Sequence, residues 1–356
     1  MNSMKKTELL GMNMLELEEF AVKMGQPRFR GRQLHRWIYV KDCCSFYEMS
    51  DIPRELRQQL DAVARISIPR VLKQRVSADG TRKFLMEMND KKRVETVLIP
   101  QSSNLNGHYT LCVSSQVGCP FRCAFCATGQ GVFQRNLAAC EIVGQLLGSR
   151  RELKRRLKNP QDPLISNVVF MGMGEPLLNF AQVIKAIQIM NDPRGIKLGQ
   201  RHITISTCGE ANGILRLAET DLQVTLAISL HAADDRLRDE LVPINKKYPL
   251  KTLMAAVNTY IEKTGRRVTF EYIMLDGVNI SRKDAENLVK LIKPFLANVN
   301  LIPYNEVDGL PYNRPAPNQV KQFYDWLVAL GLNVTIREEH GSDIKAACGQ
   351  LAVKPV

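Results

Sequence analysis

The strongest constraint on the fold is an alternation of strand-like and helix-like patterns after residue 108. Each apolar run that reads as a strand is followed by a helical pattern, and the pattern at 281–293 opens with a Ser-x-x-Asp capping box. This alternation predicts an α/β fold with a parallel sheet and right-handed crossovers, either barrel-like or doubly wound. In both arrangements, ligands bind at the carboxyl ends of the strands. The six predicted strands are Tyr109–Ser114, Asn167–Met171, His202–Ser206, Gln223–Leu230, Val268–Leu275 and Asn298–Ile302.

A glycine-bounded loop, 118–129, follows the first predicted strand and carries Cys119, Cys123 and Cys126. Thiolates bind soft metals, but no fourth Cys or His stands at the pair spacing that structural zinc commonly uses. Three thiolates on a four-iron cluster would leave one iron open to a cofactor or substrate. A zinc site with a distant fourth ligand and three unrelated core cysteines are the alternatives. The loop resembles the signature of the radical S-adenosylmethionine (SAM) superfamily.

The charge of the chain favours a polyanionic partner. Lysine and arginine number 49 against 36 aspartate and glutamate residues, a formal net charge of +13 with a pI near 9.4. Such a balance is typical of proteins that bind nucleic acid. No apolar run reaches membrane-spanning length and no signal-peptide pattern is present, so we expect a cytoplasmic protein without membrane contact whose cysteines are reduced.

The region before residue 101 has a different pattern. Helices are predicted at 14–24 and from Pro53, and three β-rich runs between residues 68 and 100 predict a small antiparallel meander. The polar segment 101–108 is a candidate domain joint. Arginines alternate with aromatic residues at 27–37, which suits either an RNA backbone or a basic helix with core aromatics. A second basic run, 150–158, is either an RNA contact or a solvated helix end.

Polar residues lie where the predicted strands end. The turn at 171–176 follows the second strand; its glycines permit close approach to a ligand, and Glu175 could bind an ammonium group. Such a group is present in SAM. Ser206 ends the third strand, Ser229 and His231 follow the fourth, and Asn305 follows the sixth. Each is more often a cap or a satisfied core group, but together they predict a lined pocket.

Isolated cysteines are by default small buried hydrophobic residues, and Cys140 and Cys208 are interpreted in that way. Cys43 and Cys44 suggest no chemistry. Two further cysteines are Cys112, within the first predicted strand, and Cys348, near the chain end. A role for either is suggested only by the sequence around it.

Three stretches resemble the RlmN family, the radical SAM methyltransferases that act on adenine C2 of RNA. They are Cys112–Cys119, the Met-Gly-Met-Gly-Glu-Pro turn and Ala-Cys-Gly-Gln-Leu at 347–351, and the resemblance extends from Arg28 to Leu351. It implies a partial (β/α)6 radical SAM barrel with an N-terminal accessory domain made of helices and the small β-meander. The domains would be an RNA-binding accessory domain at 1–100, the catalytic barrel at 101–340 and a C-terminal segment at 341–356.

The resemblance also implies the reaction and the role of each residue. The substrates would be adenine 2503 of 23S rRNA and adenine 37 of some tRNAs. Cys348 would carry the methyl group, Cys112 would resolve the protein–RNA adduct and leave a disulfide, and Cys112 or Glu95 would take the C2 proton. Cys119, Cys123 and Cys126 would hold a [4Fe-4S] cluster, reduced by a donor such as flavodoxin or ferredoxin. The SAM contacts would be Gly174, Glu175, Ser206, Ser229, Leu230, His231 and Asn305.

Two other functions remain open at this stage. A Cfr-like methyltransferase acting at adenine C8 would share the cluster and both lone cysteines, although the stretch at 176–179 favours the C2 enzyme. A non-catalytic, zinc-bearing RNA-binding protein would also explain the basic charge and the cysteine loop.

Overall fold

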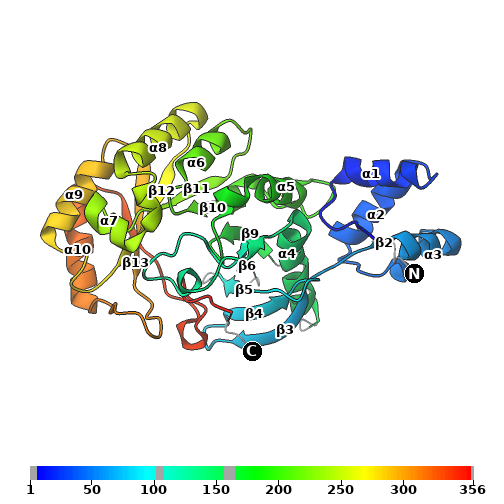
Figure 1. Ribbon diagram of the computed structural model, residues 1–356, viewed down its shortest axis with the longest axis horizontal. Coiled ribbons are helices and arrows are strands. Elements are labelled where there is room, and N and C mark those ends of the chain that lie inside the picture. The colour runs from blue at the N-terminus through cyan, green and yellow to red at the C-terminus, as the bar shows by residue number, and fades with distance from the viewer. Residues whose placement is uncertain (1–5, 102–107, 156–164, 354–356) are drawn as a thin grey trace.

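The computed structural model describes residues 6–101, 108–155 and 165–353 (Figure 1). Most of the predicted joint at 101–108 and the end of the basic run at 150–158 therefore lie outside the described residues. None of the described helices is long and apolar enough to cross a membrane.

One ten-stranded sheet organises the molecule, in the order β14-β13-β12-β11-β10-β9-β6-β5-β4-β3. The six predicted strands are confirmed, and neighbouring pairs from β6 to β13 are parallel. The short strand β14 (Val334–Ile336) adds a seventh parallel member that the sequence did not predict. The parallel strands are β6 (Tyr109–Cys112), β9 (Ile165–Phe170), β10 (Ile203–Thr207), β11 (Thr225–Ser229), β12 (Val268–Met274), β13 (Ala297–Pro303) and β14.

The parallel strands follow one another in the sheet in sequence order. A doubly wound sheet would reverse its order at a switch point, so the arrangement is that of an open, partial (β/α) barrel. Seven of the described helices cover the outer face (Figure 1). They are α4 (Ala139–Lys154), α5 (Phe180–Asn191), α6 (Ala211–Ala218), α7 (Asp235–Leu241), α8 (Leu250–Thr264), α9 (Arg282–Ile292) and α10 (Pro317–Ala329).

The core lies between these helices and the sheet because each element buries one apolar face. The helical spacing at 253–261 predicts an apolar stripe, and in α8 Leu253, Ala256, Val257 and Tyr260 are buried, whereas Ile261 is partly buried. This helix ends at Gly265, whose φ of +64° is a left-handed C-cap.

The predicted meander is confirmed as β3 (Arg70–Val76), β4 (Arg82–Glu87) and β5 (Arg93–Pro100). It is antiparallel and continues directly into the barrel sheet, because β5 pairs with β6. The helices α1 (Met14–Lys23), α2 (Phe29–Tyr39) and α3 (Arg54–Val63) lie to one side of the barrel, beyond α4 and α5 (Figure 1). The short strands β1 (Thr7–Glu8) and β2 (Ala64–Arg65) pair in parallel beside them.

Candidate active site

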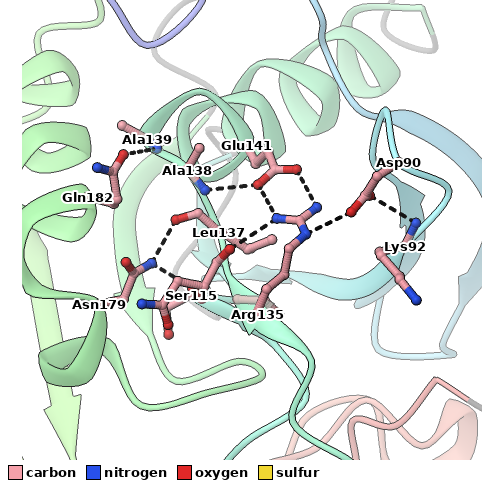
Figure 2. Close-up of polar contacts among 12 residues, drawn as sticks. Asp90, Lys92, Ser115, Arg135, Leu137, Ala138, Ala139, Glu141, Asn179 and Gln182 are labelled. Atoms are coloured by element: carbon pink, nitrogen blue, oxygen red, sulfur yellow. Dashed lines mark hydrogen bonds and ion pairs between the residues drawn. The ribbon is translucent and has the colours of Figure 1, made fainter.

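The cysteine loop is closed at its base by two sets of bonds. Strand β7 (Gln116–Val117) pairs with β8 (Arg135–Asn136), and the Asn179 side-chain amide donates to the carbonyls of Ser115 (2.9 Å) and Leu137 (2.7 Å; Figure 2). Gly118 has a φ of +77°, and a Cβ there would lie 2.2 Å from the Val132 carbonyl oxygen. Only glycine fits where the two sides of the loop meet this closely.

The loop covers a cavity of about 140 Å³ at the carboxyl ends of the parallel strands. The turn after β9 and the ends of β10 and β11 supply the other walls. Leu230 does not line the cavity, because its side chain is fully buried, and Asn305 lines an adjoining one. The predicted residues that meet in the first cavity are Cys119, Cys123, Cys126, Gly174, Glu175, Ser206, Ser229 and His231.

The donor set of the loop fits a cluster better than a single ion. Cys119, Cys123 and Cys126 all line the cavity, yet no three His, Cys, Asp or Glu side chains in the described ranges could hold one metal ion together. A [4Fe-4S] cluster takes one thiolate for each of three irons, so its ligands stand around a larger volume.

Glu175 is almost fully buried at the cavity wall. Its carboxylate oxygens accept the backbone N–H groups of Leu177 (3.0 Å) and Cys208 (2.9 Å), which fixes its orientation. Burial raises the pKa of Glu175 to about 7, although these hydrogen bonds act in the opposite direction. A cationic ligand group in the cavity would favour the charged form of Glu175 and offset part of the free energy that burial of this charge costs.

His231 is a buried neutral imidazole. Its backbone has a φ of +63°, and its Nδ1 accepts the Ile273 N–H at 3.0 Å, so any ring proton is on Nε2. Burial and, secondarily, the nearby Arg238 lower the pKa of His231 to about 3. The ring stacks edge-on against Phe125 of the cysteine loop, with centroids 4.8 Å apart. His231 can therefore form a cavity wall and donate one hydrogen bond, but it is not an acid near neutral pH.

Cys112 and Cys348 come together although they belong to opposite ends of the barrel sequence. Both line a second cavity of about 40 Å³, and Cys348 lines the first cavity as well. Burial, followed by the proximity of Cys348, raises the pKa of Cys112 to about 12, against the opposing effect of Arg337. The two thiols are free in this structure.

The segment that carries Cys348, residues 341–353, is called the strap below. The Ala127 N–H donates to the Gly349 carbonyl at 2.7 Å, and the Thr128 hydroxyl donates to the Leu351 carbonyl at 2.5 Å. On its other side the Asn305 amide lies 3.4 Å from the Cys348 carbonyl. The strap is therefore bonded by its backbone to the same turn that carries Cys126.

Glu95 lies on β5 under the strap and is bound from two sides. Its carboxylate forms an ion pair with Lys83 at 3.1 Å and accepts the Ala352 N–H at 2.9 Å. Lys83 also donates to the Lys345 carbonyl at 2.8 Å. Glu95 lines a cavity of about 500 Å³ that does not include Cys112 or Cys348.

Three titratable residues that line the first cavity were not predicted as site residues from the sequence. Glu271 and Arg337 line the first cavity, and Arg337 also lines the second, beside Cys112 and Cys348. Glu271 lies within an apolar strand and Arg337 among charged residues, so neither carries a local signal. Cys208, interpreted as a core residue, also lines the first cavity, with its Sγ 3.8 Å from that of Cys123.

The two basic runs differ from what their composition suggested. Arg150 is buried and makes two-pronged contacts with Asp42, and Lys154 lies 3.1 Å from the same carboxylate. The suggested RNA contact is therefore wrong for Arg150, because its charge holds α4 against the end of α2. At 27–37, the exposed Arg28 and Arg32 both pair with Glu18.

A sheet wound in sequence order, with a three-cysteine loop after its first parallel strand, is the architecture of a radical SAM enzyme. The model of the Radical SAM superfamily matches residues 113–292, and that of the Ribosomal RNA large subunit methyltransferase N-terminal domain matches residues 7–66. A solved radical SAM methyltransferase from Sphaerobacter thermophilus superposes with a TM-score of 0.91 at 39% identity, covering 97% of this chain and 99% of that one. The superfamily uses a [4Fe-4S] cluster and SAM.

Curated relatives narrow this class to one family. A probable dual-specificity RNA methyltransferase RlmN from Syntrophomonas wolfei is 63% identical over 99% of this chain and 98% of its own length. The dual-specificity RNA methyltransferase RlmN of Halorhodospira halophila is 45% identical over 97% of this chain and 93% of its own. The chain belongs to the RlmN family of radical SAM RNA methyltransferases.

Proposed function

We propose that this enzyme methylates C2 of adenine 2503 in 23S rRNA and of adenine 37 in tRNAs, through a methyl group carried on Cys348. The observation that carries the proposal is the shared cavity of Cys112 and Cys348, since the route needs both sulfurs within reach of each other. We place the reaction in the cytoplasm, with flavodoxin or ferredoxin as the electron donor.

The cysteine loop and the strand ends form the cofactor site in this proposal. Cys119, Cys123 and Cys126 hold the cluster, and the buried Glu175 binds the ammonium group of SAM. Ser206, Ser229, His231 and Asn305 supply polar contacts, and Leu230 contributes through its backbone. When bound, cluster and SAM together supply one-electron chemistry that can remove a hydrogen atom from an unactivated methyl group.

Two cysteines and one carboxylate perform the protein's share of the chemistry. The Cys348 thiolate takes a methyl group from SAM by displacement, forming its sulfur–carbon bond. After this carbon joins adenine C2, Glu95 or Cys112 accepts the C2 proton. The Cys112 thiolate then attacks the Cys348 sulfur and breaks its bond to the RNA-bound carbon. The bonding electron pair stays with that carbon, which takes up a proton to become the methyl group, and Cys112 and Cys348 are left as a disulfide. Two electrons from the reducing system restore both thiols.

Cys112→Ala and Cys348→Ala test the route because they stop it at different points. We expect Cys112→Ala to accumulate protein joined to RNA through Cys348, seen as a slow band on a denaturing gel that nuclease shortens. Cys348→Ala should give neither product nor crosslink. Cys140→Ala, outside both cavities, is the matched control and should turn over normally.

Normal turnover by Cys112→Ala, or a crosslink from Cys348→Ala, would refute the methylcysteine route for this chain. Mass spectrometry of the methylated nucleoside tests the position of the methyl group. A C8 product would support the Cfr-like reaction in place of the C2 reaction.

A further inference from the structure

The meander presents cations that the proposed function does not yet use. Lys73 and Arg75 lie two residues apart on β3 and therefore point to the same face of the sheet. Lys73 pairs across the sheet with Leu85 and then Glu95, whereas Arg75 pairs with Lys83, then Val97 and then Cys112. A row of paired positions thus runs from the exposed sheet edge to the proposed resolving cysteine.

A third cation lies on the other side of the strap. Lys92, in the turn between β4 and β5, lines a cavity of about 310 Å³ together with Gly118 and Thr128 of the cysteine loop. Lys73 and Arg75 line the 500 Å³ cavity that contains Glu95. Both cavities include Ala127, Ala352 and Val353, so they meet at the strap.

These three cations are exposed and uncompensated. In the described ranges, no carboxylate pairs with the side chain of Lys73, Arg75 or Lys92, in contrast to Arg28, Arg32 and Arg150. The other cations that line these two cavities are neutralised: Lys83 by Glu95, Lys345 by Asp308, and Lys91 and Arg93 by Glu87. Glu306 is the one further acid that lines these two cavities.

The turn that carries Lys92 is held in place by a specific network. Arg135 donates to Asp90 at 2.8 Å and to both oxygens of Glu141 at 2.7 Å, and Asp90 accepts the Lys92 backbone N–H at 3.1 Å. Figure 2 shows the Lys92 side chain extending away from Arg135. The network therefore fixes the turn against the start of α4 and leaves the Lys92 ammonium group free.

We propose that Lys73 and Arg75 on one side of the strap, and Lys92 on the other, bind backbone phosphates of the substrate RNA on either side of the target adenine. The inference rests on the proposed function. A nucleotide that leaves its stack to enter a catalytic pocket keeps one flanking phosphate on each side. Two groups of unpaired cations on the two sides of the Cys348 segment match this requirement, and single-stranded RNA supplies the complementary charge.

The test measures the binding of a substrate stem-loop RNA by fluorescence anisotropy as salt is varied. Each lost phosphate contact lowers the slope of log K against log salt by about 0.7 for a single strand. We expect a decrease of about 1.4 for Lys73→Glu/Arg75→Glu and about 0.7 for Lys92→Glu. Affinity at ~0.1 M salt should fall about tenfold for the double variant.

The matched control is Lys283→Glu/Lys290→Glu, which changes the net charge equally on the exposed face of α9, far from the meander (Figure 1). Its slope should equal that of the wild type. Lys73→Gln/Arg75→Gln, which only removes charge, should show a smaller loss in affinity with a similar change in slope. Wild-type slopes in the meander variants, or an equal loss in the control, would overturn the inference.

A second measurement locates the contact. A photo-crosslinking benzoylphenylalanine at position 73 should attach to nucleotides next to the methylated adenine, and attachment to a distant helix would refute the placement. Failure of the proposed function is separable, because the wild type would then form no C2-methyladenine. Methylation by the wild type together with unchanged slopes in the variants would refute the phosphate contacts alone.

Discussion

At the scale of single residues, the site depends on groups whose charge is controlled by burial. Glu175 illustrates this control, because its carboxylate has two backbone donors and still has its pKa raised to about 7. The folded chain therefore holds the Glu175 proton more tightly than the unfolded chain, in which the ordinary value is 4.5. By linkage, the stability from this group is full below pH 4.5 and is lost as pH rises towards 7.

We expect the free energy of unfolding of the SAM-free protein to fall by about 3 kcal/mol from this residue between pH 4.5 and 7. Glu175→Gln keeps a neutral side chain and should remove this part of the pH dependence. Urea titrations of both proteins across the range provide the measurement. Parallel pH profiles for the two proteins would show that burial does not control this carboxyl group.

The sequence predicted the cavity-lining residues at strand ends and missed those inside strands. Glu175 and Ser206 were predicted because a polar residue after an apolar run marks the ligand-facing edge of a parallel sheet. Glu271 was not predicted, because the sequence does not show which face of the sheet a charged residue within an apolar strand lies on. Arg337 reaches the cavity only through the pairing of β14 with β13, a contact between distant parts of the chain.

At the scale of elements, the basic run on α4 stabilises the fold. The Arg150 guanidinium and Asp42 carboxylate are both largely buried, and Arg150 also donates to the Tyr39 carbonyl at 2.8 Å at the end of α2. A count of charges along the sequence cannot reveal this pair, because its acidic member lies in another element. The suggestion of an RNA contact at Arg150 failed for this reason.

Asp42→Ala should lower the free energy of unfolding by about 3 to 5 kcal/mol, because it leaves the buried Arg150 charge without a partner. Urea unfolding followed by tryptophan fluorescence, to which Trp37 on α2 and Trp326 on α10 contribute, measures the change. RNA affinity under native conditions should remain at the wild-type value. An unchanged unfolding midpoint would show that the pair contributes nothing to the docking of α2 on α4.

At the scale of the whole molecule, the ten-stranded sheet continues across the domain boundary predicted at residue 100. The meander and the barrel were both predicted from local periodicity, but the pairing of β5 with β6 joins them into one sheet. That pairing depends on a register between strands, which no single segment encodes. The division at residue 100 stays a prediction, and truncated chains test it.

A chain of residues 101–356 should aggregate and bind little iron, because loss of β5 leaves the backbone of β6 as an open edge beside the site. A chain of residues 67–356 keeps all ten strands and should stay soluble and load its cluster. Size-exclusion chromatography and iron content per chain distinguish the two. A soluble, iron-loaded chain of residues 101–356 would establish the barrel as a separate folding unit.

The strap has a consequence for how this enzyme can vary. Its backbone is bonded to Ala127 and Thr128. The position of the Cys348 sulfur therefore depends on the number of residues that separate it from these bonds to the turn that carries Cys126. These two bonds join main-chain carbonyls of the strap, so they do not depend on the identity of the side chains at 349 and 351. An inserted or deleted residue between Gly349 and Leu351 would change the chain length between the two bonded carbonyls by up to about 3.6 Å, so both bonds could not form with Cys348 in its present place. The number of residues between the two bonded carbonyls is therefore as much a part of the site as the Cys348 side chain itself.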